Sequence, residues 1–268
     1  MNRQIEITEA INYIKTHLYD QITLDKLASH VSYSPYHFSR IFKEETGLPP
    51  LYFVSSMRLQ RAKELLLNTN MSVRDIGLEI GQQSLGTFTT RFTNSVGVTP
   101  AHFRNTQDEA EILLNSLQRL DGITDPLQSA NNPLSLKGTV FTDEEFEGVI
   151  LVGLFPKPIP EGMPLYGTLL FSLGEFQFKN VKPGLYYLFA TSVSWGMDPR
   201  SFLIPHRTLR YKPTGPIMVN GNKQVPYQDL HLRTPQLDDP PILISIPRLM
   251  NNFLQRVKDS NRKEIRTY

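Results

Sequence analysis

The sequence predicts a two-domain protein, with an all-helical domain of two helix-turn-helix units followed by a mostly β domain, a β-sandwich with a C-terminal helix. Three observations lead to this fold class. A segment that begins at Ser34 is repeated about fifty residues later, beginning at Ser84. Both copies carry helix-capping residues and helical spacing of apolar residues. After residue 107, glycine and proline become frequent, and short apolar runs or alternating patterns replace the helical periods.

The first copy predicts a helix that begins at Pro35. Ser34 is a good N-cap, and proline suits the first helical position. Phe38 and Phe42 fall one turn apart and predict a buried face. The opposite face carries hydroxyl, imidazole and cationic groups from Tyr36, His37, Ser39, Arg40 and Lys43. Since these groups can bond base edges and phosphates, the face is typical of a helix that recognises DNA.

A shorter helix is predicted before each copy, over residues 23–31 and 72–80. Each begins with a capping hydroxyl residue, carries apolar residues at helical spacing and ends in a short turn. Each pair of helices therefore forms a helix-turn-helix. The same glycine-to-proline stop ends both units, over residues 47–50 and 97–100.

The repeat implies an equivalent helix from Ser84 onward. Its candidate DNA-binding residues are Gly86, Thr87, Thr89, Thr90 and Arg91. An all-helical protein-interaction module is the alternative for both units. Apolar spacing alone would not place caps, turns and basic residues together in this way.

Residues 5–106 resemble the AraC family of bacterial transcription regulators. Besides the two units, the segment 52–66 follows the family's linker-helix pattern of a tyrosine, then Arg-Leu, then Ala, then Leu-Leu. The resemblance implies that a long helix holds both units on one side of double-stranded DNA, with RNA polymerase as a second partner. A linker helix of about 16 residues spans roughly 25 Å, while one turn of DNA repeats at about 34 Å. One monomer could therefore reach two successive major grooves.

The second unit departs from the family pattern. Gly81 and Gln82 stand where the family usually has Gly-Phe, and Thr90 and Thr93 stand where it usually has Arg and Lys. We therefore expect the second unit to hold phosphate less strongly than the first, with partial compensation by Arg91.

Charge and composition indicate a cytoplasmic protein that binds DNA through localised faces. The chain has 28 Lys and Arg against 26 Asp and Glu, and the excess lies in residues 1–107. We expect its affinity for DNA to fall with salt. The sequence has no cysteine, which excludes disulfides and suits a reducing compartment. The sequence has no signal-like start and no apolar run of about 18 residues, so we expect neither export nor a membrane span.

Three regions are expected: the DNA-binding domain over 1–107, a connecting helix and linker over 108–135, and the β-sandwich over 136–268. Strands are predicted at the following segments of the sandwich: from Leu136, and over 148–155, 174–179, 185–193, 216–220 and 229–233. The motifs at 174–181 and 183–186 resemble those of transthyretin-like or carboxypeptidase-regulatory-like sandwiches. That resemblance implies a fold and leaves the activity open.

We expect the second domain not to be an enzyme and to need no metal or cofactor. Six histidines are scattered without metal-ligand spacing, and no P-loop, nucleophile elbow or dinucleotide fingerprint is present. The best candidates for contact with a ligand are Tyr186, Trp195, Arg207 and Arg210. Arginine can grip a carboxylate or phosphate, and an aromatic ring can stack on another ring. The alternative is a solvated loop beside ordinary core aromatics.

The sequence thus predicts a sequence-specific DNA-binding transcription regulator, a monomer or a homodimer. Its second domain would sense a small-molecule effector or mediate assembly. The alternative is an architectural or competitive DNA binder whose second domain is purely structural.

Overall fold

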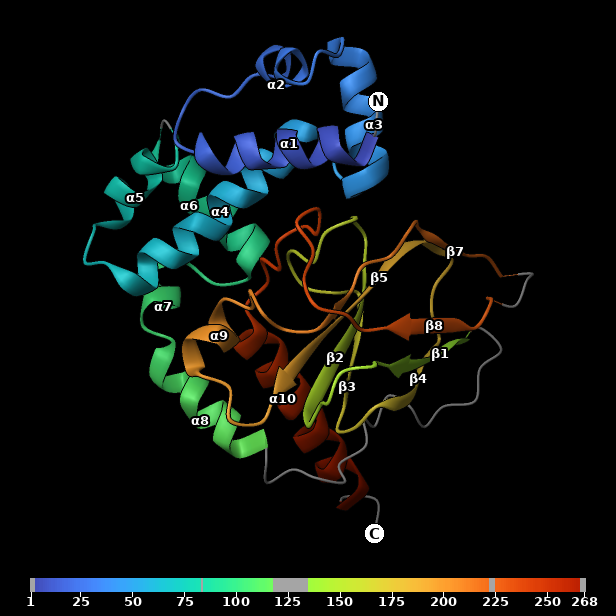
Figure 1. The fold of residues 1–268 in the computed structure, drawn as a ribbon. Helices are drawn as coiled ribbons and strands as arrows, with labels where there is room; N and C mark the ends of the chain where they lie inside the picture. Colours follow the sequence, from blue (N-terminus) through green and yellow to red (C-terminus); the bar gives the residue numbers. More distant parts are fainter. Residues whose placement is uncertain (1–2, 83, 118–134, 222–224, 266–268) are drawn as a thin grey trace. The chain divides into compact units, whose positions relative to one another are not determined.

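The computed structural model describes residues 3–82, 84–117, 135–221 and 225–265, and its contacts divide the chain into two compact units (Figure 1). The first, here called the helical unit, contains Met1–Thr106, Pro158–Gly162 and Gln236–Leu243. The second, here called the β unit, contains Gln107–Lys157, Met163–Pro235 and Ile244–Tyr268.

The helical unit contains both predicted helix-turn-helix units. Its helices are α1 (Arg3–Thr16), α2 (Leu24–His30), α3 (Pro35–Thr46), α4 (Pro50–Asn68), α5 (Val73–Glu79), α6 (Leu85–Val96) and α7 (Pro100–Arg104). Helices α2 and α3 form the first unit, α5 and α6 form the second, and α4 is the linker helix between them.

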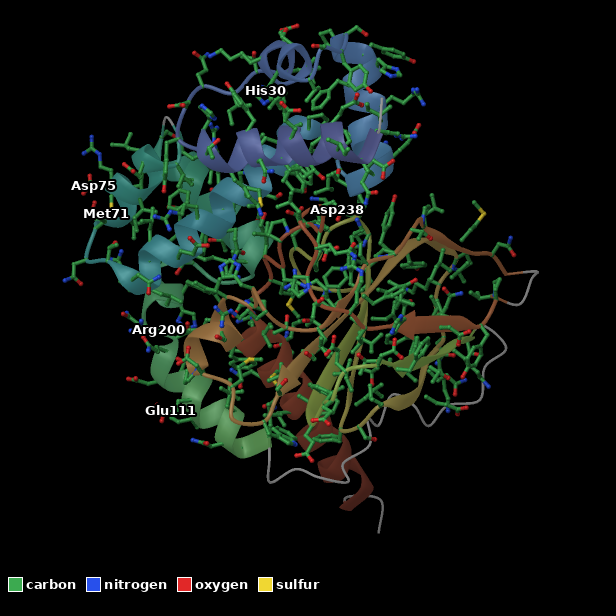
Figure 2. The ribbon with its side chains drawn as sticks, viewed as in Figure 1. His30, Met71, Asp75, Glu111, Arg200 and Asp238 are labelled. Atoms are coloured by element: carbon green, nitrogen blue, oxygen red, sulfur yellow. The ribbon has the colours of Figure 1, made fainter. Side chains whose placement is uncertain are left out.

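The predicted helix caps are confirmed. The side-chain oxygens of Thr23, Ser34, Ser72 and Ser84 each accept a hydrogen bond from a backbone N–H in the first turn of the helix that follows. The Ser72 hydroxyl also donates to the carboxylate of Asp75, labelled in Figure 2, at 2.7 Å. The first helix of each helix-turn-helix unit therefore begins where the sequence predicts.

The last helix of each helix-turn-helix unit ends at a glycine in the left-handed backbone conformation. Gly47 has a φ of 81° after α3, and Gly97 has a φ of 90° after α6. In each case the glycine N–H donates to the carbonyl of the residue four positions earlier. Because a side chain makes this conformation costly, glycine ends both helices at equivalent places.

Paired phenylalanines form the core beneath α3 and α6. Phe38 and Phe42 of α3 are fully buried, and so are Phe88 and Phe92 of α6. The ring of Phe42 meets Phe53 of α4 edge-on at 5.5 Å between centroids. The equivalent ring, Phe92, meets Phe103 of α7 edge-on at 5.8 Å. The fifty-residue repeat thus extends to a third aromatic position in each unit.

The helical unit also contains two segments from late in the sequence, Pro158–Gly162 and Gln236–Leu243. The Leu243 N–H donates to the carbonyl of Pro160 at 3.0 Å, so the two segments are bonded to each other. The Ile242 carbonyl accepts from the ammonium of Lys63 on α4 at 3.1 Å. The helical unit therefore includes residues that lie outside the segment 1–107, which the sequence predicted as the whole DNA-binding domain.

The β unit contains two sheets and three helices among its described residues. Its elements are α8 (Gln107–Leu117), β1 (Ser135–Phe141), β2 (Gly148–Phe155), β3 (Tyr166–Leu170), β4 (Gly174–Lys179), β5 (Gly184–Ser194), α9 (Pro199–Leu203), β6 (Arg210–Tyr211), β7 (Ile217–Val219), β8 (Gln228–His231) and α10 (Ile246–Ile265). One sheet has the strand order β4-β1-β8, with β1 and β8 parallel. The other has the order β3-β2-β5-β6, and β7 also pairs with β5.

One apolar core is shared by strands of both sheets. Its residues include Leu136, Phe176 and Leu230 from the first sheet and Ile150 and Leu188 from the second. All five are buried, and alternate side chains along each strand point to the same face. The coarse prediction, a helical region followed by a β-rich region with a C-terminal helix, is therefore confirmed.

Some elements of the β unit were not predicted. Sequence patterns predicted β2 and β4 at their observed bounds, but the short strands β3 and β6 and the helix α9 were missed. The predicted connecting helix corresponds to α8, which belongs to the β unit. The linker predicted over 121–135 lies outside the described residues, apart from Ser135, which begins β1. Within the described ranges, no helix is both long and apolar enough to span a membrane.

We expect the buried Lys63 to make the stability of the helical unit depend on pH. Its side chain is fully buried, and its ammonium lies 5.5 Å from the centre of the Phe103 ring. Burial lowers the pKa of Lys63 to about 7, although the nearby Glu64 acts in the opposite direction. Above this pH the folded chain releases a proton that the unfolded chain keeps up to its ordinary value of 10.5. The contribution of Lys63 to stability should therefore rise with pH across this window and stay constant below it.

We predict that the free energy of unfolding of the wild type, minus that of Lys63→Met, rises between pH 7 and pH 9. The slope should approach, and not exceed, about 1.4 kcal/mol per pH unit, the value for one proton. Urea unfolding followed by circular dichroism at several pH values measures this difference. Lys26→Met, at an exposed position on α2, is the control for the loss of a lysine side chain. A flat difference for Lys63→Met would contradict the prediction.

Candidate nucleic-acid interface

The outward face of α3 carries all five side chains predicted for it. Tyr36 is 83% exposed, and Arg40 and Lys43 are also exposed. His37 and Ser39 are half-buried on the same helix. Burial of the phenylalanine pair on the inner side fixes which face of α3 is left for a partner.

Arg40 is held on this face by surface contacts. Its guanidinium bonds the carboxylate of Glu44 at 2.9 Å, and its second amino group lies 3.4 Å from Nδ1 of His37. Glu44 also forms an ion pair with Arg3, and these contacts, Arg3 first, lower the pKa of Glu44. Since exposed ion pairs of this kind contribute little to stability, a phosphate or a base edge can replace Glu44 at small cost.

The outward face of α6 is richer in hydroxyl groups and poorer in charge. Gly86, Thr87 and Thr90 are exposed, and Thr89 and Arg91 are half-buried. The Ser84 hydroxyl donates to the Thr87 hydroxyl at 2.8 Å, so Thr87 belongs to the cap as well as to the face. The two helices thus present different chemistry, charged on α3 and mainly neutral on α6.

Arg58 on α4 was not among the predicted site residues. Its guanidinium donates to the carbonyl of Leu18 at 2.9 Å and to that of Asp20 at 2.7 Å, which fixes the loop after α1. Burial and, to a smaller extent, the charge of Arg91 lower the pKa of Arg58. Arg58 also lies against Gly81, whose φ is 78°, in the turn before α6. The sequence signal that could have identified Arg58 was its position in the Arg-Leu pattern of the linker helix.

The structure does not bring the four candidate ligand-contact residues together. Tyr186 lies near the start of β5 and Trp195 directly follows its end, so the two are about 30 Å apart at the usual rise of a strand. Tyr186 is buried and donates to the Lys182 carbonyl at 2.7 Å. Arg210 is buried and donates to the Pro205 carbonyl, whereas Arg207 is exposed. Across the described ranges, no three His, Asp or Glu side chains are grouped so that they could hold a metal ion.

Comparison with known proteins places the helical unit in a family. The profile of a family described as a helix-turn-helix domain matches residues 27–106. YobQ of Bacillus subtilis (strain 168), an HTH-type transcriptional regulator, is 37% identical over 97 residues, which make up 36% of this chain and 40% of YobQ. The transcriptional activator AarP of Providencia stuartii is 31% identical over 98 residues, 37% of this chain and 73% of AarP.

A crystal structure from Chromobacterium violaceum, of a transcriptional regulator with an AraC-type DNA-binding domain, is 30% identical to this chain. The match has a TM-score of 0.38 and covers 38% of this chain and 92% of that one. This chain belongs to the AraC family of transcription regulators. AraC-family membership accounts for the two helix-turn-helix units. The matched segment spans less than half of YobQ, so the comparison bears on that segment alone.

The cap of α6 can be tested by replacing Ser84. Ser84→Ala removes the acceptor that the Thr87 N–H uses at 3.2 Å. We predict a loss of about 0.5–2 kcal/mol in the free energy of unfolding. Ser84→Asp keeps an acceptor at this position and serves as the control, which should stay close to the wild type. Urea titrations of the three proteins provide the measurement, and equal stability of all three would show that the cap contributes nothing.

Proposed function

We propose that this protein is a sequence-specific transcription regulator that places α3 and α6 in successive major grooves of double-stranded DNA. The observation that carries the proposal is the structural repeat. Two capped helices, fifty residues apart, bury equivalent phenylalanine pairs and turn a polar face outward. An interaction module would not need a donor-rich outer face on each of the two repeated helices.

The length of α4 supports this arrangement. Its 19 residues give a helix of about 28 Å. This length is close to the repeat of about 34 Å for one turn of DNA, the spacing at which successive major grooves face the same side. A single copy of the chain could therefore contact two grooves.

Within this proposal the two helices have different roles. On α3, Arg40 reads a base and Lys43 contacts phosphate, with further contacts from Tyr36, His37 and Ser39. On α6, the contacts come from Gly86, Thr87, Thr89, Thr90 and Arg91. Since Arg91 is the one predicted contact on α6 that carries a charge, α3 supplies most of the charged contacts.

We further propose that the β unit is a sandwich of its two sheets that senses a small molecule or mediates assembly. The core shared by both sheets supports the sandwich. RNA polymerase as a second partner, and a monomer or homodimer as the active form, belong to the same proposal. Footprinting with and without cell metabolites separates it from an architectural or competitive DNA binder, because the footprint of a sensor should respond to its effector.

The proposed role of Arg40 predicts a loss that depends on DNA sequence. A bidentate contact with guanine is worth about 1–3 kcal/mol, so Arg40→Ala should weaken binding to a selected site roughly 5- to 150-fold. Binding to random DNA should change much less. Thr90→Ala should cost less on the selected site, because one hydroxyl offers a single weak contact. Titration of fluorescently labelled DNA, selected from a random pool with the wild-type protein, measures all of these affinities.

The control for Arg40→Ala is Lys43→Ala, which removes a proposed phosphate contact on the same helix. This variant should weaken binding to selected and random DNA alike and should reduce the dependence of affinity on salt. Equal losses on both DNAs for Arg40→Ala would instead make Arg40 a phosphate contact. Failure of the wild-type protein to select any DNA would overturn the proposed function.

A further inference from the structure

The segment Pro158–Gly162 belongs to the helical unit although it lies between two strands of the β unit. Strand β2 ends at Phe155 and strand β3 begins at Tyr166, and the two strands pair antiparallel. The segment is therefore the tip of the β2–β3 loop. Because both ends of this loop continue directly into a paired strand, the tip is tied to the β unit by short stretches of chain.

One carboxylate in this loop tip contacts two helices of the helical unit. Oε1 of Glu161 accepts a hydrogen bond from the Tyr52 hydroxyl on α4. Oε2 of the same side chain accepts from the Ser95 hydroxyl on α6 at 3.2 Å. Glu161 thus bridges the linker helix and the second helix of the second helix-turn-helix unit.

The backbone beside Glu161 reinforces the contact with α6. The Gly162 N–H donates to the carbonyl of Ser95 at 2.7 Å. Gly162 has a φ of 63°, and a Cβ atom there would lie 3.1 Å from the carbonyl oxygen of Asn94. Both the conformation and the close approach therefore favour glycine at this position. Ser95 is 7% exposed, so its own end of both bonds is shielded from water, while Glu161 is half-buried.

The loop tip is also bonded to the segment Gln236–Leu243. Pro160 accepts from Leu243, whose neighbour Ile242 accepts from the buried Lys63 on α4. Tyr52 and Lys63 are eleven positions apart on α4, a distance of about 16 Å along the helix. The two late segments are therefore anchored on α4 at two separate places.

Glu161 and Gly162 of this loop tip bond to α6 in the second helix-turn-helix unit, whereas Pro158 lies beside Gly47 at the end of α3 in the first. Fifty residues before Ser95, the equivalent position is Glu45, which is partly exposed and pairs with Arg3 at 3.0 Å. The last turn of α3 is thus tied to α1, an element of its own half of the unit. The last turn of α6 is tied to a loop that leads into the β sheet.

We propose that Glu161 is a positioning residue for DNA recognition, since it sets the orientation of α6 on α4 and makes the second major-groove contact depend on the β2–β3 loop. This inference rests on the proposed function of α6. The first contact, made by α3, does not depend on Glu161.

The test uses the full-length protein and two DNAs. One carries the complete selected site, and the other keeps only the half that α3 protects. Glu161→Ala should bind the complete site roughly tenfold more weakly, a change within the usual range of coupling between parts of a protein. Its footprint should be lost over the α6 half alone, and its affinity for the α3 half-site should equal that of the wild type.

Two conservative variants separate positioning from general stability. Glu161→Gln can still bond both hydroxyl groups and should restore most of the α6 footprint. Tyr52→Phe removes one hydroxyl from the bridge and should give a smaller loss with the same preference for the α6 half. Circular dichroism checks that each variant is folded. If Glu161→Ala does not fold, Tyr52→Phe still decides, because its loss must be confined to the α6 half.

A folded Glu161→Ala with an unchanged footprint, or with equal losses on both DNAs, would overturn the inference. The proposed function would survive that result, because the wild-type protein would still protect both halves. If the wild-type protein protects neither half, the proposed function itself fails. The two failures are therefore distinguishable in one set of experiments.

Discussion

The helical unit depends on the burial of one phenylalanine pair beneath each repeated helix. Phe38 and Phe42 on α3, and Phe88 and Phe92 on α6, are fully buried. Because side chains four positions apart share a helix face, burying each pair settles the rotation of its helix. The polar residues between them must then face outward. The surface available to a partner is in this sense a consequence of where the hydrophobic side chains are placed.

The third phenylalanine of each repeat links the local pattern to the longer architecture. Phe53 belongs to the linker helix α4, whereas its equivalent Phe103 belongs to the short helix α7. The same edge-on contact therefore joins α3 to a helix of 19 residues and α6 to one of five. The second repeat lacks an equally long supporting helix of its own, and contacts from elsewhere in the chain also hold α6.

Glu161 supplies such support to α6 through Ser95, and two segments that are distant in sequence also bond to α4. The hydroxyl of Tyr52 and the carboxylate of Glu161 are separated by 109 positions, and Lys63 and Ile242 by 179. A fully buried lysine is costly unless its charge is compensated or lost, and the carbonyl of Ile242 supplies one of the needed acceptors. The late segments thus take part in the polar interior of the helical unit.

The sequence by itself determined the features that rest on neighbouring residues. These features are the four helix caps, the glycine stops, the outward face of α3 and the strands β2 and β4. Each depends on side chains within a few positions of one another, where geometry is set by the local period. Only the tertiary structure decided the parallel pairing of β1 with β8, the short strands β3 and β6, and the bridge made by Glu161. A strand of two residues such as β6 carries too little pattern to be recognised, and a hydrogen bond between distant residues exists only once the whole chain has brought them together.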